Sequence, residues 1–102
     1  MSIYSKKLFD GYLTGAGAHA LFTVPSGHTY VIRSITYSTF SAAVNQGYVG
    51  RAGNSVLAGW VNLAVLLPQT VNMRQVLNAG DALQCVLVTS DVLLAISGYD
   101  LT

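Results

Sequence analysis

The chain has 102 residues and a formal net charge of +1, and only 9% of its residues are charged, against about 25% in an ordinary soluble domain. The length fits one domain, residues 1–102, and the small net charge gives no electrostatic basis for binding nucleic acid. The longest apolar run, residues 56–67, is interrupted by a glycine and an asparagine and is too short to span a membrane as a helix. Glu is absent and Lys occurs only at Lys6 and Lys7, so the long charged side chains that cover solvated helices are missing. This composition predicts an all-β fold.

Short β-rich segments separated by turn residues follow one another along the whole chain. We expect eight strands, over residues 3–9, 19–24, 28–40, 46–51, 56–67, 70–77, 82–89 and 92–101. Closely spaced strands without helices between them are typical of a single antiparallel β-sandwich, and eight strands favour a jelly-roll topology. Residues 1–10 are expected to form either an edge strand or an arm that docks on a partner. The glycine-rich segment 11–17 is expected to be a loop.

Two of these strands have an apolar pattern that does not by itself show which face is buried. In residues 28–40, Tyr30 and Ile32 alternate on one face, whereas Ile35 and Tyr37 follow on the other. A bulge near Arg33–Ser34 would explain the change of face, and so would burial of both faces. In the strand that begins at residue 56, the odd positions form a continuous apolar face, which places the even positions on the opposite face.

The turns are marked most clearly in two segments built on the same plan. Residues 23–32 and 76–86 each contain a short apolar stretch, a glycine turn and then a β-rich run. In the first segment Pro25 presets φ for the turn and Gly27 tolerates a positive φ. The short link Ser90–Asp91 predicts a hairpin between the last two strands.

Residues able to support catalysis or bind a metal are few. His19 and His28 flank the first turn and could approach each other, but no carboxylate or thiolate is near them in sequence to complete a zinc site, and we expect His28 to face solvent. Turn chemistry accounts for most of the four carboxylates, which are Asp10, Asp81, Asp91 and Asp100. Cys85 lies in an apolar strand pattern typical of a buried, unreactive thiol. We therefore expect no enzymatic activity, no catalytic residues, no metal and no cofactor.

The hydrophobic fraction of 52% exceeds what one small sandwich needs for its core. We therefore expect a homo-oligomer, with a trimer favoured, in which strand arginines pair with carboxylates or stack on rings between subunits. The candidate interface residues are Ile3, Tyr4, Lys6, Lys7, Phe9, Arg33, Arg51, Trp60 and Arg74.

Three segments also carry a resemblance to a known group of proteins. Leu21–Ile35, which reads LFTVPSGHTYVIRSI, resembles the opening of small β-sandwich virion structural proteins of tailed bacteriophages. Leu77–Leu83 and Ala95–Leu101 are similar to the closing half of the same proteins, so the resemblance covers residues 19–101. It implies a β-sandwich subunit of a phage particle that acts by binding and has no catalytic residues.

The expected function is therefore that of a capsid decoration or cementing subunit that binds other virion proteins, such as the major capsid protein. Residues 1–7 lack the apolar core of a signal peptide, so we expect synthesis in the host cytoplasm and residence in the virion. One alternative is a subunit associated with the neck, tail or a fibre. Another is a carbohydrate-binding module that uses Trp60 and surface Tyr residues, and a small enzyme is the third.

Overall fold

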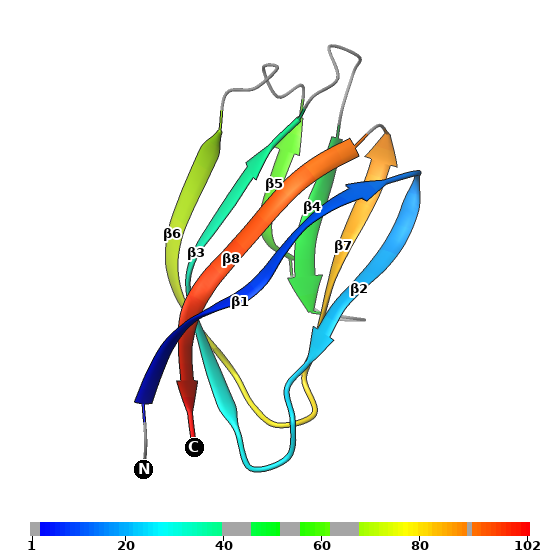
Figure 1. The fold of residues 1–102 in the computed structure, drawn as a ribbon. Coiled ribbons are helices and arrows are strands. Elements are labelled where there is room, and N and C mark those ends of the chain that lie inside the picture. Colours follow the sequence, from blue (N-terminus) through cyan, green and yellow to red (C-terminus); the bar gives the residue numbers. More distant parts are fainter. Residues whose placement is uncertain (1–2, 40–45, 52–55, 62–67, 90) are drawn as a thin grey trace.

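The computed structural model describes residues 3–39, 46–51, 56–61, 68–89 and 91–102, and this part of the chain is all-β (Figure 1). Its eight strands are β1 (Ile3–Thr14), β2 (Gly17–Thr23), β3 (Thr29–Ser38), β4 (Gln46–Arg51), β5 (Val56–Val61), β6 (Gln69–Leu77), β7 (Ala82–Thr89) and β8 (Asp91–Leu101). The number of strands and the all-β class agree with the sequence-based expectation. Residues 62–67, which we expected to continue the fifth strand, lie outside the described residues.

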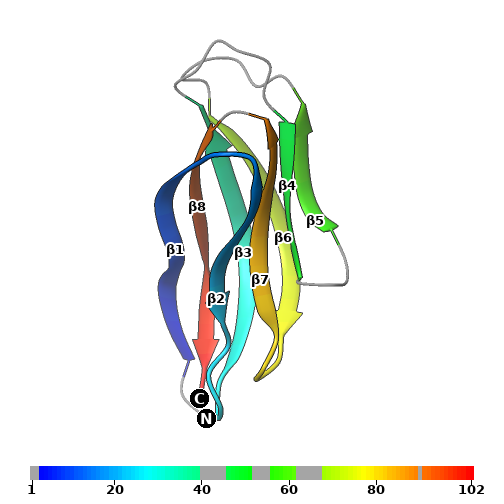
Figure 2. The ribbon, with the colours of Figure 1, turned by 90° about the vertical axis from the view of Figure 1, so that its right-hand side faces the viewer.

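The strands form two four-stranded sheets, ordered β1-β8-β3-β6 and β2-β7-β4-β5, and every neighbouring pair is antiparallel. The first strand pairs with the eighth, the second with the seventh, the third with the sixth and the fourth with the fifth. This nested pairing is that of a long hairpin rolled into two sheets, which is a jelly roll. The two sheets face each other in an elongated sandwich of about 45 × 24 × 18 Å, with both termini at one end (Figures 1 and 2).

Two local expectations are wrong. The expected loop 11–17 is largely strand, because β1 continues to Thr14 in register with β8, with Gly11 opposite Leu94. The expected hairpin between the last two strands does not form, because β7 and β8 belong to different sheets. Ser90, which joins the two strands in sequence, lies outside the described residues.

The predicted bulge in β3 is confirmed. The pairing of β3 with both neighbours shifts register between Ile32 and Ser34. Arg33 is the extra residue opposite β8, whereas on the other side two β6 residues, Met73 and Arg74, lie opposite Arg33. The shift turns Ile35 to the same side as Ile32, so both side chains are completely buried, whereas Arg33 is exposed. The change of face therefore comes from the bulge and not from burial of both faces. A matching shift after Lys7 in β1 lies against the same part of β8, so bulges flank this strand on both sides.

The core lies between the sheets and is almost entirely apolar. Its largest fully buried hydrophobic side chains are Val24, Ile32, Ile35, Val49, Leu77, Leu83, Leu87, Val92, Leu94 and Ile96. Cys85 is buried among them, as expected, and burial raises the pKa of its thiol to about 12.

The two similar turn segments contact each other directly. The backbone N–H of Val24 donates to the carbonyl of Asp81 at 2.9 Å, and the N–H of Gly80 donates to the carbonyl of Val24 at 2.9 Å. Gly27 and Gly80 both adopt positive φ, at 84° and 91°, as their turn positions require. Each turn carries the chain from one sheet to the other, so the pair closes the end of the sandwich near the termini (Figure 1).

Candidate functional site

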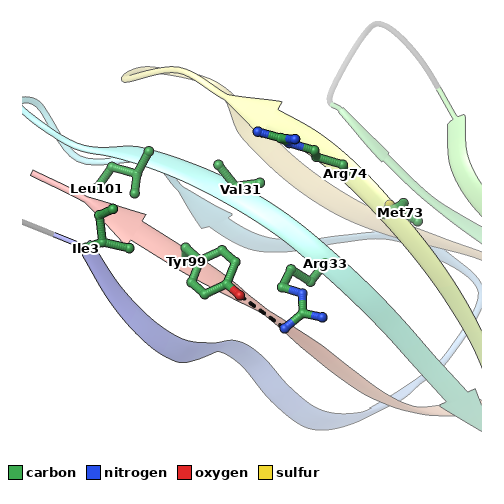
Figure 3. Close-up of a pocket in the computed structure, with 7 residues that line it drawn as sticks. All are labelled: Ile3, Val31, Arg33, Met73, Arg74, Tyr99 and Leu101. Atoms are coloured by element: carbon green, nitrogen blue, oxygen red, sulfur yellow. Dashed lines mark hydrogen bonds between the residues drawn. The ribbon is translucent and has the colours of Figure 1, made fainter.

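An open hollow lies on the outer face of the sheet β1-β8-β3-β6, near the end that holds both termini (Figure 3). Its volume is about 660 Å³. We call it the arginine pocket, and its lining residues come from all four strands: Ile3, Val31, Arg33, Met73, Arg74, Tyr99 and Leu101. It therefore combines apolar walls with two guanidinium groups. Three of the nine interface residues predicted from the sequence, Ile3, Arg33 and Arg74, meet here.

Arg33 lies on the outer face because it follows the buried Ile32 in the strand alternation. Since Arg33 is the extra residue opposite β8, Ser34 faces outward as well before Ile35 turns into the core. The Nη1 of Arg33 donates a hydrogen bond to the Tyr99 hydroxyl at 3.1 Å, and its guanidinium carbon lies 5.5 Å from the centre of the Tyr99 ring. This cation–π contact and hydrogen bond fix the guanidinium over β8 (Figure 3).

The distribution of ion pairs sets Arg33 and Arg74 apart from the other cations. All five Lys and Arg residues and all four Asp residues lie within the described ranges. Three of the cations have a carboxylate within 4 Å: Lys6 with Asp100 at 3.6 Å, Lys7 with Asp10 at 3.1 Å, and Arg51 with Asp81 at 3.7 Å. In this part of the chain, neither Arg33 nor Arg74 has a carboxylate partner. The arginine pocket thus carries positive charge that no side-chain carboxylate of the described chain neutralises.

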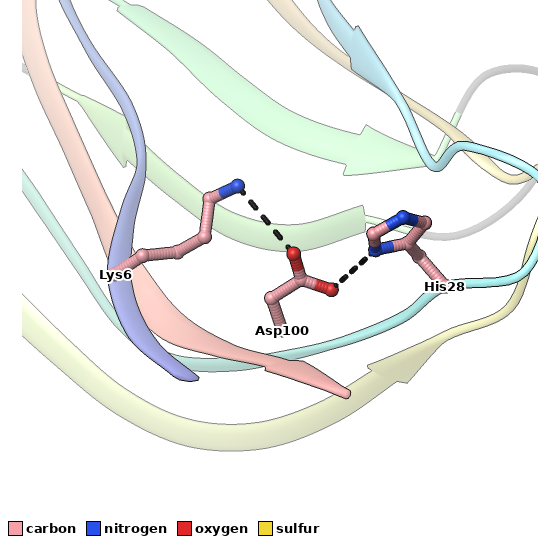
Figure 4. A network of polar contacts seen from close by, with 3 residues as sticks. All are labelled: Lys6, His28 and Asp100. Atoms are coloured by element: carbon pink, nitrogen blue, oxygen red, sulfur yellow. Dashed lines mark hydrogen bonds and ion pairs between the residues drawn. The ribbon is translucent and has the colours of Figure 1, made fainter. Parts of the chain in front are cut away.

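A second polar cluster, at the same end of the sandwich, consists of Lys6, His28 and Asp100 (Figure 4). The side chain of Asp100 is only 10% exposed and lies between Lys6 Nζ and His28 Nδ1, the latter at 2.8 Å. Lys6 also lies over the ring of Tyr30, at 5.2 Å from its centre. The expectation that His28 faces solvent is wrong, because Asp100 holds it in a half-buried position. The cluster connects β1, β8 and the first turn. Lys6 therefore pairs with a carboxylate of its own subunit.

Asp91 forms a third polar cluster, on β8. Its carboxylate is buried and accepts hydrogen bonds from the Thr39 hydroxyl at 2.7 Å and from the Tyr12 hydroxyl. The hydrogen bond to Asp91 raises the pKa of the Tyr12 phenol, and partial desolvation raises it by a smaller amount. Its residue type predicts that Asp91 lies in a turn, whereas the structure places it at the start of β8. Its hydrogen-bond partners lie 52 and 79 positions away in the sequence, and no local pattern indicates them.

Trp60 is not the surface residue that the sequence suggested. It is only 6% exposed and stacks on Tyr37, with ring centres 4.9 Å apart. Of the two faces of this strand, the one with the even positions is the buried one, because Ala58 and Trp60 point into the core. The reason lies in the neighbouring strand: Gly47 is paired with Trp60, and a Cβ at Gly47 would lie 2.7 Å from the indole. The missing side chain of Gly47 makes the room that the indole occupies.

The remaining expected site residues are dispersed. Tyr4 is exposed at 57%, Phe9 packs against the core, and Arg51 lies on the other sheet beside Asp81. Residues 3–10 lie in β1, so the edge-strand alternative describes them. His19 hydrogen-bonds the carbonyl of Gly15 at 2.8 Å, so the two histidines have different partners.

Among the described residues, no group of three or more His, Cys, Asp or Glu side chains lies close enough together to hold a metal ion. The described part of the chain also contains no helix long and apolar enough to cross a membrane. Comparison with protein-family models, with curated proteins and with solved structures finds no match for this chain.

Proposed function

We propose that the chain is a structural subunit of a bacteriophage particle, which decorates the capsid, associates with copies of itself and works by binding. The observation that carries the proposal is the arginine pocket, an open apolar hollow with two arginines that lack a carboxylate partner in the described chain. Arginine next to exposed apolar side chains is characteristic of protein interfaces. The jelly roll, which viral capsid domains commonly adopt, and the resemblance over residues 19–101 support the same proposal.

The two sheets differ in charge, which supports a separate role for each outer face. The strands β2, β7, β4 and β5 contain one charged residue, Arg51, at the end of β4, where it pairs with Asp81. An uncharged row crosses this sheet through register partners: Ala18, Val86, Tyr48 and Gly59. Burying an uncharged face removes no ion from water and so carries little desolvation penalty. We propose that copies of the subunit associate through this face, with a trimer as the expected assembly.

The arginine pocket, on the opposite side of the sandwich, then stays available for the particle. In this arrangement the outer face of β1-β8-β3-β6 contacts another virion protein, such as the major capsid protein. The burial of Trp60 takes away one of the aromatic residues that the carbohydrate-binding alternative names, and leaves it the exposed Tyr4 and Tyr12. Since the apolar and cationic groups lie together in the arginine pocket, attachment to a protein surface is the function that its chemistry supports best.

The test is to locate the chain in purified particles. Phage particles would be banded in a density gradient, analysed by mass spectrometry and labelled with an antibody against the chain. The proposal predicts many copies per particle and label over the capsid. Absence of the chain from banded particles would contradict it, and label at the neck or tail would move the subunit to that position. Sedimentation velocity of the purified chain tests self-association separately, with a monomer at micromolar concentration as the contrary result.

A further inference from the structure

We propose that the arginine pocket binds an extended acidic segment of a different protein, with carboxylates of that segment on Arg33 and Arg74 and an apolar side chain between them. This inference rests on the proposed function, because it names the partner chemistry of the same face. Three observations support it: the apolar walls of the pocket, its two arginines and the scarcity of accessible carboxylates in this chain.

The walls require an apolar ligand group. Ile3, Val31, Met73 and Leu101 line the pocket, and Ile3 is 64% exposed. Val31 lies between the two arginines across the sheet (Figure 3). An apolar side chain placed over Val31 would cover this exposed hydrocarbon, whereas a fully hydrated anion would leave it in water.

The charges require carboxylates. Arg33 is held by Tyr99 with one nitrogen of its guanidinium group, which leaves its other N–H donors for a ligand. Arg74 lies on the far side of Val31, so the pocket presents two separate cationic groups flanking an apolar centre (Figure 3). An extended segment projects every second side chain to one face. A segment whose face reads acidic, apolar, acidic therefore matches the order of the groups across the sheet.

The carboxylates have to come from another protein, because this chain has few to offer. It contains four side-chain carboxylates, and two of them, Asp91 and Asp100, are buried within the sandwich. Asp81 is held by Arg51 and by the backbone N–H of Asn78 in the second glycine turn. Only Asp10, in an exposed pair with Lys7, could be released at little cost. A second copy of the chain thus supplies at most one accessible side-chain carboxylate for two arginines.

The inference is tested with peptides and the full chain in solution. The probe is a blocked, fluorescein-labelled nine-residue peptide with two Asp on one face of an extended strand and a Leu between them. Its matched control carries Asn in place of both Asp. We expect fluorescence anisotropy to show saturable binding of the acidic peptide and binding at least about tenfold weaker for the amide peptide. Arg33→Gln and Arg74→Gln should each reduce binding of the acidic peptide, also by about tenfold. Lys7→Gln, which removes one charge outside the pocket, should leave it unchanged.

Three results would overturn the inference. Equal binding of the acidic and amide peptides would show that the pocket does not recognise carboxylates. Equal or tighter binding of a single-stranded oligonucleotide with the same net charge would show that it recognises anionic charge in general. Self-association that is lost in Asp10→Asn, Arg33→Gln and Arg74→Gln alike would make a second copy the occupant. Each of these results leaves the particle experiment untouched, so failure of the inference can be distinguished from failure of the proposed function.

Discussion

Replacing Gly98 by Ala should destabilise the sandwich strongly, because the added methyl group has no space. Gly98 lies on β8 opposite Ile32, next to the bulge that carries Arg33. A Cβ at this position would lie 1.9 Å from the carbonyl oxygen of Val31 and 3.1 Å from the Cα of Ile32. Contacts below 3.0 Å essentially never occur for real Cβ atoms, so the two strands would have to separate by about 1 Å.

The magnitude follows from what has to move. Overpacking a core costs about 1–3 kcal/mol when side chains can rearrange. Here the obstacle is the backbone of a central strand, which no rotamer change relieves, so we expect a loss of at least about 3 kcal/mol. Small domains have total stabilities of about 5–15 kcal/mol, so this substitution would remove a large share.

The assay is urea denaturation followed by tryptophan fluorescence, with Gly59→Ala as the matched control. Gly59 lies in β5 with its nearest non-neighbouring atom 3.4 Å from a built Cβ, and its φ is not positive. Gly59→Ala should therefore change the unfolding free energy by less than about 1 kcal/mol. A denaturation midpoint for Gly98→Ala equal to that of the wild type would refute the reasoning. It would mean that β3 and β8 do not approach each other as closely as described.

Three further predictions concern buried groups. Trp60→Ala should lower the unfolding free energy by about 3–5 kcal/mol, because it empties the space beside Tyr37. The variant has no tryptophan, so urea denaturation is followed by circular dichroism, and a loss below about 1 kcal/mol would indicate an exposed indole. Asp100→Asn should cost about 1–3 kcal/mol, because it removes the charge that holds His28 in place; an unchanged thermal midpoint would contradict this. Burial raises the pKa of the Cys85 thiol to about 12 from 9.0, so a thiol reagent should modify it only after unfolding, and rapid labelling of the native protein at pH 8 would contradict its burial.

The raised pKa of Cys85 also predicts a direction for the pH dependence of stability. The unfolded chain releases the thiol proton near pH 9, whereas the folded chain holds it until about pH 12. The neutral thiol therefore makes its full contribution to the unfolding free energy below pH 9, and this contribution falls as the pH rises from 9 towards 12. Cys85→Ala removes this titration, so the difference in unfolding free energy between wild type and variant should narrow above pH 9. A difference in unfolding free energy that stays constant above pH 9 would contradict the raised pKa of Cys85.

The sequence predicted those parts of the fold that depend on local patterns. Strand periodicity and turn residues located eight strands. The slip in alternation between Ile32 and Ile35 left two explanations, a bulge or burial of both faces, and the structure shows the bulge. The facing of β5 could not be predicted from its own residues. Both of its faces are apolar, and the choice depends on Gly47 in β4, which leaves room for Trp60.

The candidate site could be predicted only in part. Arginines within strands are conspicuous in so weakly charged a chain, and the sequence names Arg33 and Arg74 among nine interface candidates. That these two line one pocket depends on the pairing of β3 with β6, which the sequence does not indicate. The partners of the carboxylates could not be predicted from the sequence. Asp100 lies 72 positions from His28, and their pairing depends on how the long hairpin folds into two sheets. The expected hairpin between the last two strands is wrong for the same reason: the fold of the long hairpin places β7 and β8 in different sheets.

Attachment to particles tests the central claim most directly. Purified chain would be mixed with phage particles that lack it and sedimented, and the bound amount would be measured for the wild type, for Lys7→Gln and for the double variant Arg33→Gln/Arg74→Gln. The account predicts saturable attachment of the wild type and of Lys7→Gln, and loss of attachment in the double variant while its urea midpoint stays unchanged. Attachment of the double variant at the wild-type level, or wild-type chain that stays in the supernatant, would contradict it.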